Sequence, residues 1–298
     1  MRVLHLDTGR EMRGGQWQVL RLMEQLAQAG HQPVLLARSH SPLLELAARH
    51  ALDAKPIGIG TLAREAKLAD LVHAHDGRSH TLSAALRRTP LVVSRRVAFP
   101  VQSNAASRWK YSRARHFIAV SEHVRRMLIE AQVPKKKISV VYDGVPEAAP
   151  VEGGRLILAP ATDDPAKGSA LVLEAARLAG LEIKFSTNLE VDLREAALFV
   201  YVTRREGLGS GALMAMAAGV PVVASRVGGL VEIIEDGESG LLVENDPVAI
   251  ERAIRRLYGD PDLRRRLGAR ARERVREQFS VAAMVRGTLD VYHRVLTC

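Results

Sequence analysis

Short apolar runs alternate with segments of helical periodicity along the whole chain. Strands buried in a parallel sheet read as continuous apolar runs, whereas amphipathic helices repeat their apolar positions with a period of 3.6 residues. In the first half of the chain, this pattern predicts strands at residues 3–6, 33–37, 70–74, 91–94, 116–120 and 138–141. It predicts helices at residues 15–29, 42–50, 79–88 and 122–131, with Ser41 and Ser121 as caps of the second and the last.

The same alternation begins again after residues 143–154, a segment rich in proline, glycine and alanine that we interpret as a linker. Strands are predicted at residues 156–159, 182–185, 198–202, 220–224 and 240–243. Helices are predicted at residues 169–178, 191–197, 210–218, 231–234, 247–258, 261–279 and 281–296. This order predicts an α/β fold of two doubly wound, Rossmann-like parallel-sheet domains that face a cleft. We place the domains at residues 1–148 and 149–280, followed by a C-terminal helix at 281–298.

The composition of the 298 residues indicates a folded chain without a membrane span. With 47% hydrophobic and 26% charged residues, the chain has enough apolar material for a core, which excludes intrinsic disorder. The longest stretch without charged or strongly polar residues, 212–224, is shorter than the ~20 residues of a transmembrane helix. The N-terminus carries no apolar signal core, so we expect a cytoplasmic protein. The single cysteine, Cys298, excludes an intrachain disulfide and a thiolate zinc site.

Positive charge is concentrated in the first half of the chain. The net charge is +11 over residues 1–150 and −1 over residues 151–298, and residues 87–137 contain thirteen basic and two acidic residues. Such a segment predicts an anionic partner, namely a membrane surface, a phosphorylated substrate or nucleic acid, unless it is an ordinary solvated surface. Nucleic acid is disfavoured, because aromatic residues for base stacking make up only 4% of the chain.

A glycine pair follows the first predicted strand. Gly14 and Gly15 open the helix at 15–29, where backbone N–H groups and the helix dipole favour a bound anion. An ordinary glycine-rich turn is the alternative interpretation. The spacing G-x-G-x-x-G is absent, so this turn is not a dinucleotide-binding fingerprint.

A longer block in the second half carries a family resemblance. It contains Glu-Gly-Leu-Gly at 206–209, Ala-Ala-Gly-Val-Pro-Val-Val-Ala-Ser at 217–225 and Val-Gly-Gly at 227–229. From residue 200 to 245 the chain closely resembles the C-terminal domain of the retaining family-four glycosyltransferases, which have the GT-B fold. Weaker resemblance occurs at residues 14–15, 72–76, 118–121 and 142–145. The resemblance implies transfer from a nucleotide-diphosphate sugar, but it does not name the sugar.

The resemblance also implies roles for particular residues. Lys167 would neutralise charge on the departing diphosphate, Glu206 would contact the donor sugar, and His75 would lie on the sugar side of the cleft. The residues implied in donor binding are Gly14, Gly15, Gly207, Leu208, Gly209, Ser210 and Met214. In the family's front-face chemistry the leaving phosphate accepts the proton of the acceptor, so neither a protein base, nor a metal, nor a cofactor is expected. Each role has an alternative without a substrate. Glu206 could be a carboxylate stabilised by the dipole at a helix start, Lys167 a solvated loop lysine, and His75 a strand-end histidine with a structural hydrogen bond.

The acceptor side is suggested by position and charge. Arg95 and Arg96 follow a predicted strand and are candidates for a phosphate on the acceptor, whereas Asp7 and Asp76 follow strands without an assignable role. Together with the basic first half, they suggest a cell-envelope glycolipid or polysaccharide acceptor and peripheral attachment to the inner face of an anionic membrane. The final helix, by the same resemblance, would cross back onto the first domain.

Three departures from the family pattern weaken the expected donor site. Met214 stands where the family has a second glutamate, which binds the ribose hydroxyls, and Thr162 stands where it has an arginine. Residues 186–191 replace a further helix and strand. These departures support an alternative hypothesis, a non-catalytic GT-B protein that acts as a binding or scaffold partner. A basic nucleic-acid-binding module is the third hypothesis.

Overall fold

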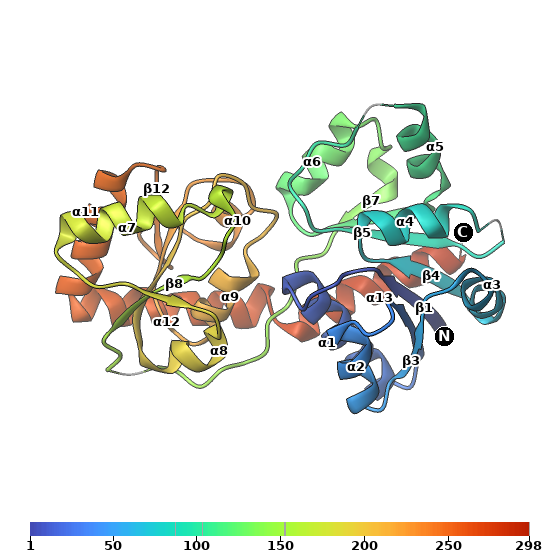
Figure 1. Cartoon of the computed structure of the whole chain (residues 1–298), viewed down its shortest axis with the longest axis horizontal. Coiled ribbons are helices and arrows are strands. Elements are labelled where there is room, and N and C mark those ends of the chain that lie inside the picture. Colours follow the sequence, from blue (N-terminus) through green and yellow to red (C-terminus); the bar gives the residue numbers. More distant parts are fainter. Residues whose placement is uncertain (87, 103, 152, 298) are drawn as a thin grey trace. The chain divides into compact units, whose positions relative to one another are not determined.

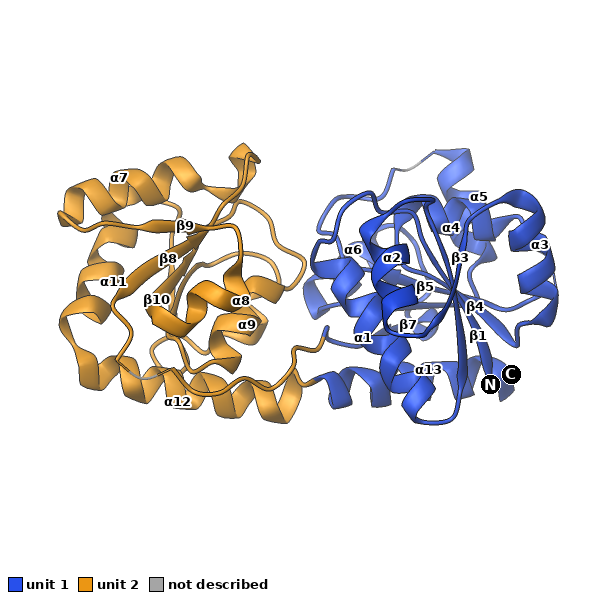
Figure 2. Ribbon diagram, turned by 60° about the horizontal axis from the view of Figure 1, so that its bottom comes forward, with its two compact units in different colours: residues 1–143, 281–298 blue, residues 144–280 orange. Residues whose placement is uncertain are grey.

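A computed structural model describes residues 1–86, 88–102, 104–151 and 153–297. Arg87, at the start of the basic segment, and Cys298 lie outside the described residues. The chain divides into two compact units, which Figure 2 distinguishes by colour. Unit 1 comprises Met1–Asp143 together with the C-terminal segment from Val281, and unit 2 comprises Gly144–Ser280. The first unit is therefore built from two separate stretches of sequence.

Unit 1 contains a seven-stranded sheet in which every described pairing is parallel. Its strands are β1 (Arg2–Asp7), β2 (Gln32–Ala37), β3 (Asp53–Pro56), β4 (Leu71–Ala74), β5 (Leu91–Arg95), β6 (His116–Ala119) and β7 (Ile138–Val140). Its helices are α1 (Gly14–Gln28), α2 (Pro42–Arg49), α3 (Ile59–Leu68), α4 (Gly77–Ala84), α5 (Ala105–Arg113), α6 (Glu122–Glu130), η1 (Lys135–Lys137) and α13 (Val281–Thr297). The strand order, β3-β2-β1-β4-β5-β6-β7, reverses direction between β1 and β4, as in a doubly wound fold (Figure 1).

The last helix belongs to the core of unit 1. Leu22 of α1, Val3 of β1 and Tyr292 of α13 are almost completely buried in one hydrophobic cluster. Removing such apolar side chains from water contributes about 1.5–3 kcal/mol each. The core of unit 1 is therefore incomplete without a segment that follows unit 2 in the sequence.

Unit 2 contains a five-stranded parallel sheet with the order β9-β8-β10-β11-β12. Its strands are β8 (Leu156–Pro160), β9 (Lys184–Ser186), β10 (Ala196–Tyr201), β11 (Val222–Ser225) and β12 (Leu241–Val243). Its helices are η2 (Pro165–Lys167), α7 (Ser169–Ala179), α8 (Leu189–Asp192), η3 (Leu193–Glu195), α9 (Ser210–Ala217), α10 (Leu230–Ile233), α11 (Pro247–Gly259) and α12 (Pro261–Gln278). The predicted fold of two parallel-sheet α/β units is confirmed.

Local signals placed several helix starts correctly. The Ser41 side chain accepts a hydrogen bond from the Leu44 amide at 3.3 Å, and the Ser121 side chain accepts one from the Val124 amide at 3.1 Å. Both serines thereby satisfy an amide that the first turn of a helix leaves without a partner.

Other expectations were wrong at their boundaries. The helix predicted at 79–88 begins at Gly77, because Asp76 caps it by accepting from the amides of Arg78 and Ser79. The helix predicted at 191–197 ends at Glu195, because the fully buried run from Ala196 forms strand β10. Strand β3 and helices α3 and α5 were not predicted, and α5 has no buried residue to give its sequence a period.

No helix in the described part of the chain combines the length and the apolar character needed to cross a membrane.

Candidate functional site

The strand order of unit 2 places two predicted residues at the same point of the sheet. Strands β8 and β10 are neighbours, and their connections leave in opposite directions along the sheet, which makes a topological switch point. Ligands of open α/β sheets bind outside the carboxyl ends of the strands at such points. Lys167 follows β8 and Glu206 follows β10, and the Lys167 Nζ lies 2.7 Å from the Glu206 Oε2. Residues 39 positions apart therefore form an ion pair where the fold favours a ligand.

Glu206 is held by three donors. Besides Lys167, the Tyr201 hydroxyl donates to Oε2 at 2.8 Å and the Gly207 amide donates to Oε1 at 3.0 Å. The Lys167 ammonium also lies 5.8 Å from the centre of the Tyr201 ring. Burial, followed by the charge of Glu206, raises the pKa of Tyr201 well above its usual value, so the hydroxyl remains a donor. Tyr201 was not among the predicted site residues, although its place at the end of the buried strand β10 is a signal that could have indicated it.

The glycine-rich block is explained by close contact between two loops. Gly228 has a φ of +55°, and a Cβ there would lie 2.1 Å from the Glu206 carbonyl oxygen. The Gly229 amide donates to that same oxygen at 3.1 Å. The loop after β11 thus packs directly on the backbone of the loop after β10. This contact fixes the direction in which the Glu206 segment enters α9.

The remaining donor-binding candidates of unit 2 lie at the start of α9. Gly207, Leu208 and Gly209 are buried, and Gly209, with a φ of +108°, is the N-terminal cap of the helix. Ser210 and Met214 lie one turn apart and so share a side of α9. Both are partly exposed. A thioether at position 214 offers a bound hydroxyl only a weak acceptor.

The loop before Lys167 is ordered by its own acidic residue. Asp164 accepts a hydrogen bond from the Ala166 amide at 2.9 Å, and Gly168 adopts a φ of +68° against Val202. The Ala166 carbonyl in turn accepts from the Arg204 amide at 2.8 Å. Asp164 therefore stabilises the turn that presents Lys167. Thr162, in the same loop, accepts from the Asp164 amide at 3.2 Å.

In unit 1, a second group of candidates gathers at the switch point between β1 and β4. Helix α1 begins at Gly14, and a Cβ on Gly15 would lie 3.8 Å from the Arg96 Cδ. The Arg96 Nε donates to Asp143 at 2.9 Å, and its Nη1 donates to the His75 Nδ1 at 3.3 Å. The structure therefore brings Arg96, His75 and the glycine turn together. Asp143, at the start of the predicted linker, was not recognised as their partner.

Three buried histidines surround this point. The His5 Nδ1 and the His75 Nε2 are 2.9 Å apart, while His73 bonds to the hydroxyls of Tyr292 and Ser94 at 2.6 and 2.8 Å. Burial first, and then neighbouring positive charge, lowers the pKa of all three, that of His5 to about 3. The cluster is neutral at pH 7. Because an arginine only donates, the His75 Nδ1 accepts and its Nε2–H donates to His5.

The same geometry argues against a metal ion at these histidines. Their ligand atoms lie within 4.8 Å of one another, which is the spacing of a possible cation site. However, both ring nitrogens of His73 and of His75 already have hydrogen-bond partners, and the Arg96 guanidinium adds positive charge beside them. A cation would have to break these bonds. The donor set fits a hydrogen-bond network better than a metal centre.

Arg95 points to a different partner from Arg96. Its Nη1 donates to the Tyr111 hydroxyl at 2.9 Å, and its Nη2 donates to the Phe99 carbonyl. It therefore connects the loop after β5 to α5. Of the two arginines, Arg96 lies with the other candidate residues of unit 1, while Arg95 braces the surface loop.

Two family models match the chain, one over most of unit 1 and one within unit 2. Residues 12–148 match the model described as Glycosyltransferase Family 4, and residues 181–274 match the one described as Glycosyl transferases group 1. Solved structures with the same fold include Anabaena HepE in complex with UDP, at a TM-score of 0.86, 16% identity and coverage of 99% of this chain and 100% of that one. A glycosyltransferase from Rickettsia africae matches at a TM-score of 0.85, with 17% identity and coverage of 99% and 98%. The two units have the GT-B fold.

The chain belongs to the group 1, family-four glycosyltransferases, as the resemblance predicted. Among curated relatives, the α-maltose-1-phosphate synthase of Mycolicibacterium smegmatis is 43% identical over 110 residues, which cover 35% of this chain and 28% of that one. The D-inositol 3-phosphate glycosyltransferase of Streptomyces avermitilis is 34% identical over 169 residues, covering 53% and 35%. The N-acetyl-α-D-glucosaminyl L-malate synthase of Bacillus anthracis is 38% identical over 100 residues, covering 33% and 26%. The matches span about a third or less of these relatives.

Proposed function

We propose that the protein is a retaining glycosyltransferase that moves a hexose-type sugar from a nucleotide-diphosphate donor to an anionic acceptor of the cell envelope. The observation that carries the proposal is the Lys167–Glu206 pair at the switch point of unit 2, beside the start of α9. A helix N-terminus and a lysine together suit a diphosphate. A carboxylate held by Tyr201 suits the hydroxyl groups of a sugar.

The proposed mechanism uses these groups without a protein base. The bond between the anomeric carbon and the diphosphate oxygen breaks, and Lys167 with the α9 amides stabilises the charge that develops on that oxygen. The acceptor oxygen attacks from the same face, and its proton passes to the leaving phosphate. Glu206 orients the sugar. Burial lowers the pKa of His75 and both of its ring nitrogens are hydrogen-bonded, so its role is to hold its neighbours in place rather than to carry a proton.

For unit 1, we propose that Arg96 and the turn at Gly14 and Gly15 bind an anionic group of a substrate. The guanidinium is oriented from two sides by Asp143 and His75, so its position is fixed before a ligand arrives. The names of three relatives contain a phosphate or malate. An acceptor that carries a phosphate or a carboxylate is consistent with this chemistry.

The donor proposal is tested by calorimetric titration with UDP, GDP, ADP and their sugar conjugates. UDP is the first probe, because solved structures of Anabaena HepE contain UDP and UDP-glucose. Saturable binding of one nucleotide, weakened in Glu206→Ala when its sugar conjugate is used, would support the donor site. If the folded protein binds none of them, the alternative hypothesis of a non-catalytic GT-B partner replaces the enzyme.

Met214→Glu is expected to increase the affinity for the nucleotide. A carboxylate on this face of α9 would accept a hydrogen bond from a ribose hydroxyl, worth about 1.5–3 kcal/mol, so the Kd should fall by roughly tenfold to a hundredfold. The measurement is the same titration, with Met214→Gln as the uncharged control. An unchanged affinity in both variants would mean that no ribose lies at this helix.

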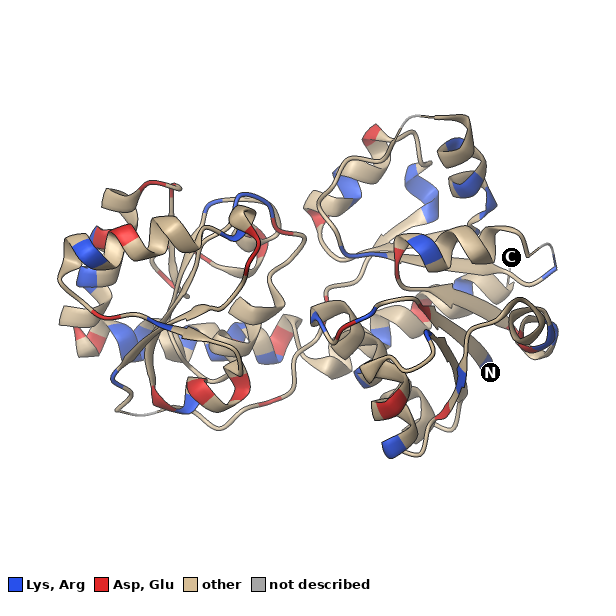
Figure 3. Cartoon of the chain, in the orientation of Figure 1, with Lys and Arg blue, Asp and Glu red and all other residues tan. Residues whose placement is uncertain are grey.

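A part of unit 1 fits the proposed membrane attachment. Phe99 lies in the loop after β5 and is 59% exposed, and Trp109 lies in α5 and is 51% exposed. Helix α5 also carries Arg108, Lys110 and Arg113 (Figure 3). Aromatic and basic side chains together favour the interface of an anionic bilayer. We expect vesicles of phosphatidylglycerol to capture the protein, salt to release it, and Phe99→Ser with Trp109→Ser to reduce capture several-fold. Equal capture by uncharged vesicles would contradict the attachment.

A further inference from the structure

A groove of about 900 Å³ lies at the amino ends of the unit 2 strands, whereas Lys167 and Glu206 lie beyond their carboxyl ends. Its floor contains the amino end of β10, at Ala196 and Ala197, and Val220 before β11. Glu206 follows the other end of β10, which is roughly 16 Å away along the strand. None of the candidate residues described above lines this groove. The groove is therefore separate from the candidate donor site.

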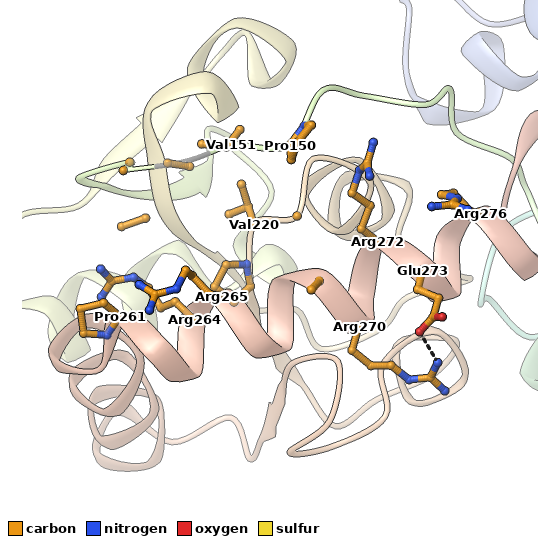
Figure 4. A pocket seen from close by; sticks show the side chains of 17 residues that line it. Pro150, Val151, Val220, Pro261, Arg264, Arg265, Arg270, Arg272, Glu273 and Arg276 are labelled. Atoms are coloured by element: carbon orange, nitrogen blue, oxygen red, sulfur yellow. Dashed lines mark hydrogen bonds and ion pairs between the residues drawn. The ribbon is translucent and has the colours of Figure 1, made fainter.

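One wall of the groove is the arginine-rich helix α12 (Figure 4). Arg264, Gly268, Arg272 and Arg276 follow one another at intervals of four residues and share one face of the helix. At Gly268 the helix packs against the turn at Gly219, so closely that a Cβ on Gly268 would lie 1.9 Å from the Gly219 carbonyl oxygen. The three arginines consequently lie along the seam where α12 packs against the turn. Arg265 also lines the groove.

Two arginines of the groove already have partners. Arg264 donates through Nη1 to the carbonyls of Leu257 and Tyr258, and Arg265 forms an ion pair with the exposed Asp262.

The guanidinium groups of Arg272 and Arg276 keep unused hydrogen-bonding capacity. Arg272 donates through Nη2 to the Ala148 carbonyl at 3.1 Å, yet its Nε is buried and has no partner among the described residues. Arg276 is exposed and has neither an ion pair nor a hydrogen bond within the described ranges. The one carboxylate of the lining, Glu273, is paired with Arg270 at 2.8 Å. The wall therefore keeps a net positive charge.

The arrangement indicates the class of ligand. A guanidinium group can donate two parallel hydrogen bonds to the oxygens of one phosphate. The helix rises about 18 Å from Arg264 to Arg276, which is too far for a single phosphate to contact both arginines. The lining described for the groove has no aromatic side chain on which a base could stack, which disfavours nucleic acid. We propose that the α12 groove is a further anion site, separate from the sites at Lys167 and Arg96, for an extended row of phosphate groups. Such a row is supplied by a soluble oligophosphate or by the headgroups of an anionic lipid.

The test is calorimetric titration of the whole protein with linear inorganic polyphosphate and, separately, with orthophosphate. The wild-type protein should bind the polymer more tightly than the monomer. The double variant Arg265→Gln with Arg276→Gln should lose at least about tenfold in polymer affinity. Both side chains are exposed, so the variant should keep its fold. The control, Arg252→Gln with Arg266→Gln, removes the same charge from exposed positions of unit 2 outside the groove and should bind normally.

Lys167→Ala separates this site from the donor site. It should leave polyphosphate binding unchanged, even where it abolishes binding of a nucleotide sugar. Loss of polymer binding in Lys167→Ala, or unchanged binding in the groove variant, would overturn the proposal. Phosphatidylglycerol vesicles then distinguish the source: capture that the groove variant weakens indicates lipid, and capture that it leaves intact, with polymer binding lost, indicates a soluble oligophosphate.

Discussion

Lys167→Ala is expected to lower the rate of sugar transfer by about 10²–10³-fold. A cation that stabilises a developing negative charge acts mainly in the transition state, and the loss of one such group typically costs this much. The removal would also leave the Glu206 carboxylate, which is 14% exposed, without its positive partner. The measurement is release of the nucleotide diphosphate from its sugar conjugate, with kcat and kcat/KM expected to fall together.

A matched control is available in the same unit. Lys184 forms an ion pair with Asp192 at the same distance of 2.7 Å, but it lies on the edge strand β9 and is 50% exposed. Exposed pairs of this kind contribute about 0–1 kcal/mol, so Lys184→Ala should transfer sugar nearly as fast as the wild type. Equal activity of the two variants would show that the Lys167–Glu206 pair only stabilises its loops.

Gly268→Ala is expected to destabilise unit 2 by about 3 kcal/mol. Helix propensity alone predicts the opposite, because alanine is favoured over glycine by about 1 kcal/mol inside a helix. The new Cβ would lie 1.9 Å from the Gly219 carbonyl oxygen, and a backbone atom cannot move aside as a flexible side chain can. Overpacking of this kind typically costs 1–3 kcal/mol. Urea unfolding of Gly268→Ala and of the wild type measures the change in the free energy of unfolding.

Gly259→Ala supplies the comparison for Gly268→Ala. It lies at the end of α11, and a Cβ there would meet nothing within 4 Å. Its free energy of unfolding should stay within about 1 kcal/mol of the wild-type value. A stabilised Gly268→Ala variant would mean that α12 can move away from the turn at little cost.

The sequence predicted those features that depend on nearby residues. Continuous apolar runs predicted most strands, and Ser41 and Ser121 predicted helix starts, because a cap and its amide lie three residues apart. The region of Glu206 was recognisable because the glycines at 228 and 229 pack on its backbone, which leaves no room for a side chain. A steric requirement of this kind produces a recognisable motif.

The rest depended on contacts between distant parts of the chain. Tyr201 and Asp143 bond to Glu206 and Arg96, and nothing in their own segments indicates these partners. Helix α5 escaped prediction because it buries no residue and so lacks an apolar face. The histidine network joins β1, β4, β5 and α13, and only the completed sheet brings those elements together.

The return of α13 to unit 1 has a consequence for the order of folding during synthesis. Unit 2 is, in effect, a domain inserted into unit 1, because the chain leaves unit 1 after Asp143 and re-enters it at Val281. A ribosome makes all of unit 2 before it makes Tyr292, which completes the apolar cluster of unit 1 and bonds to His73. The sheet of unit 1 therefore lacks the helix α13 that covers its apolar cluster until synthesis is nearly complete. Unit 2 is continuous in sequence, so it can fold before unit 1.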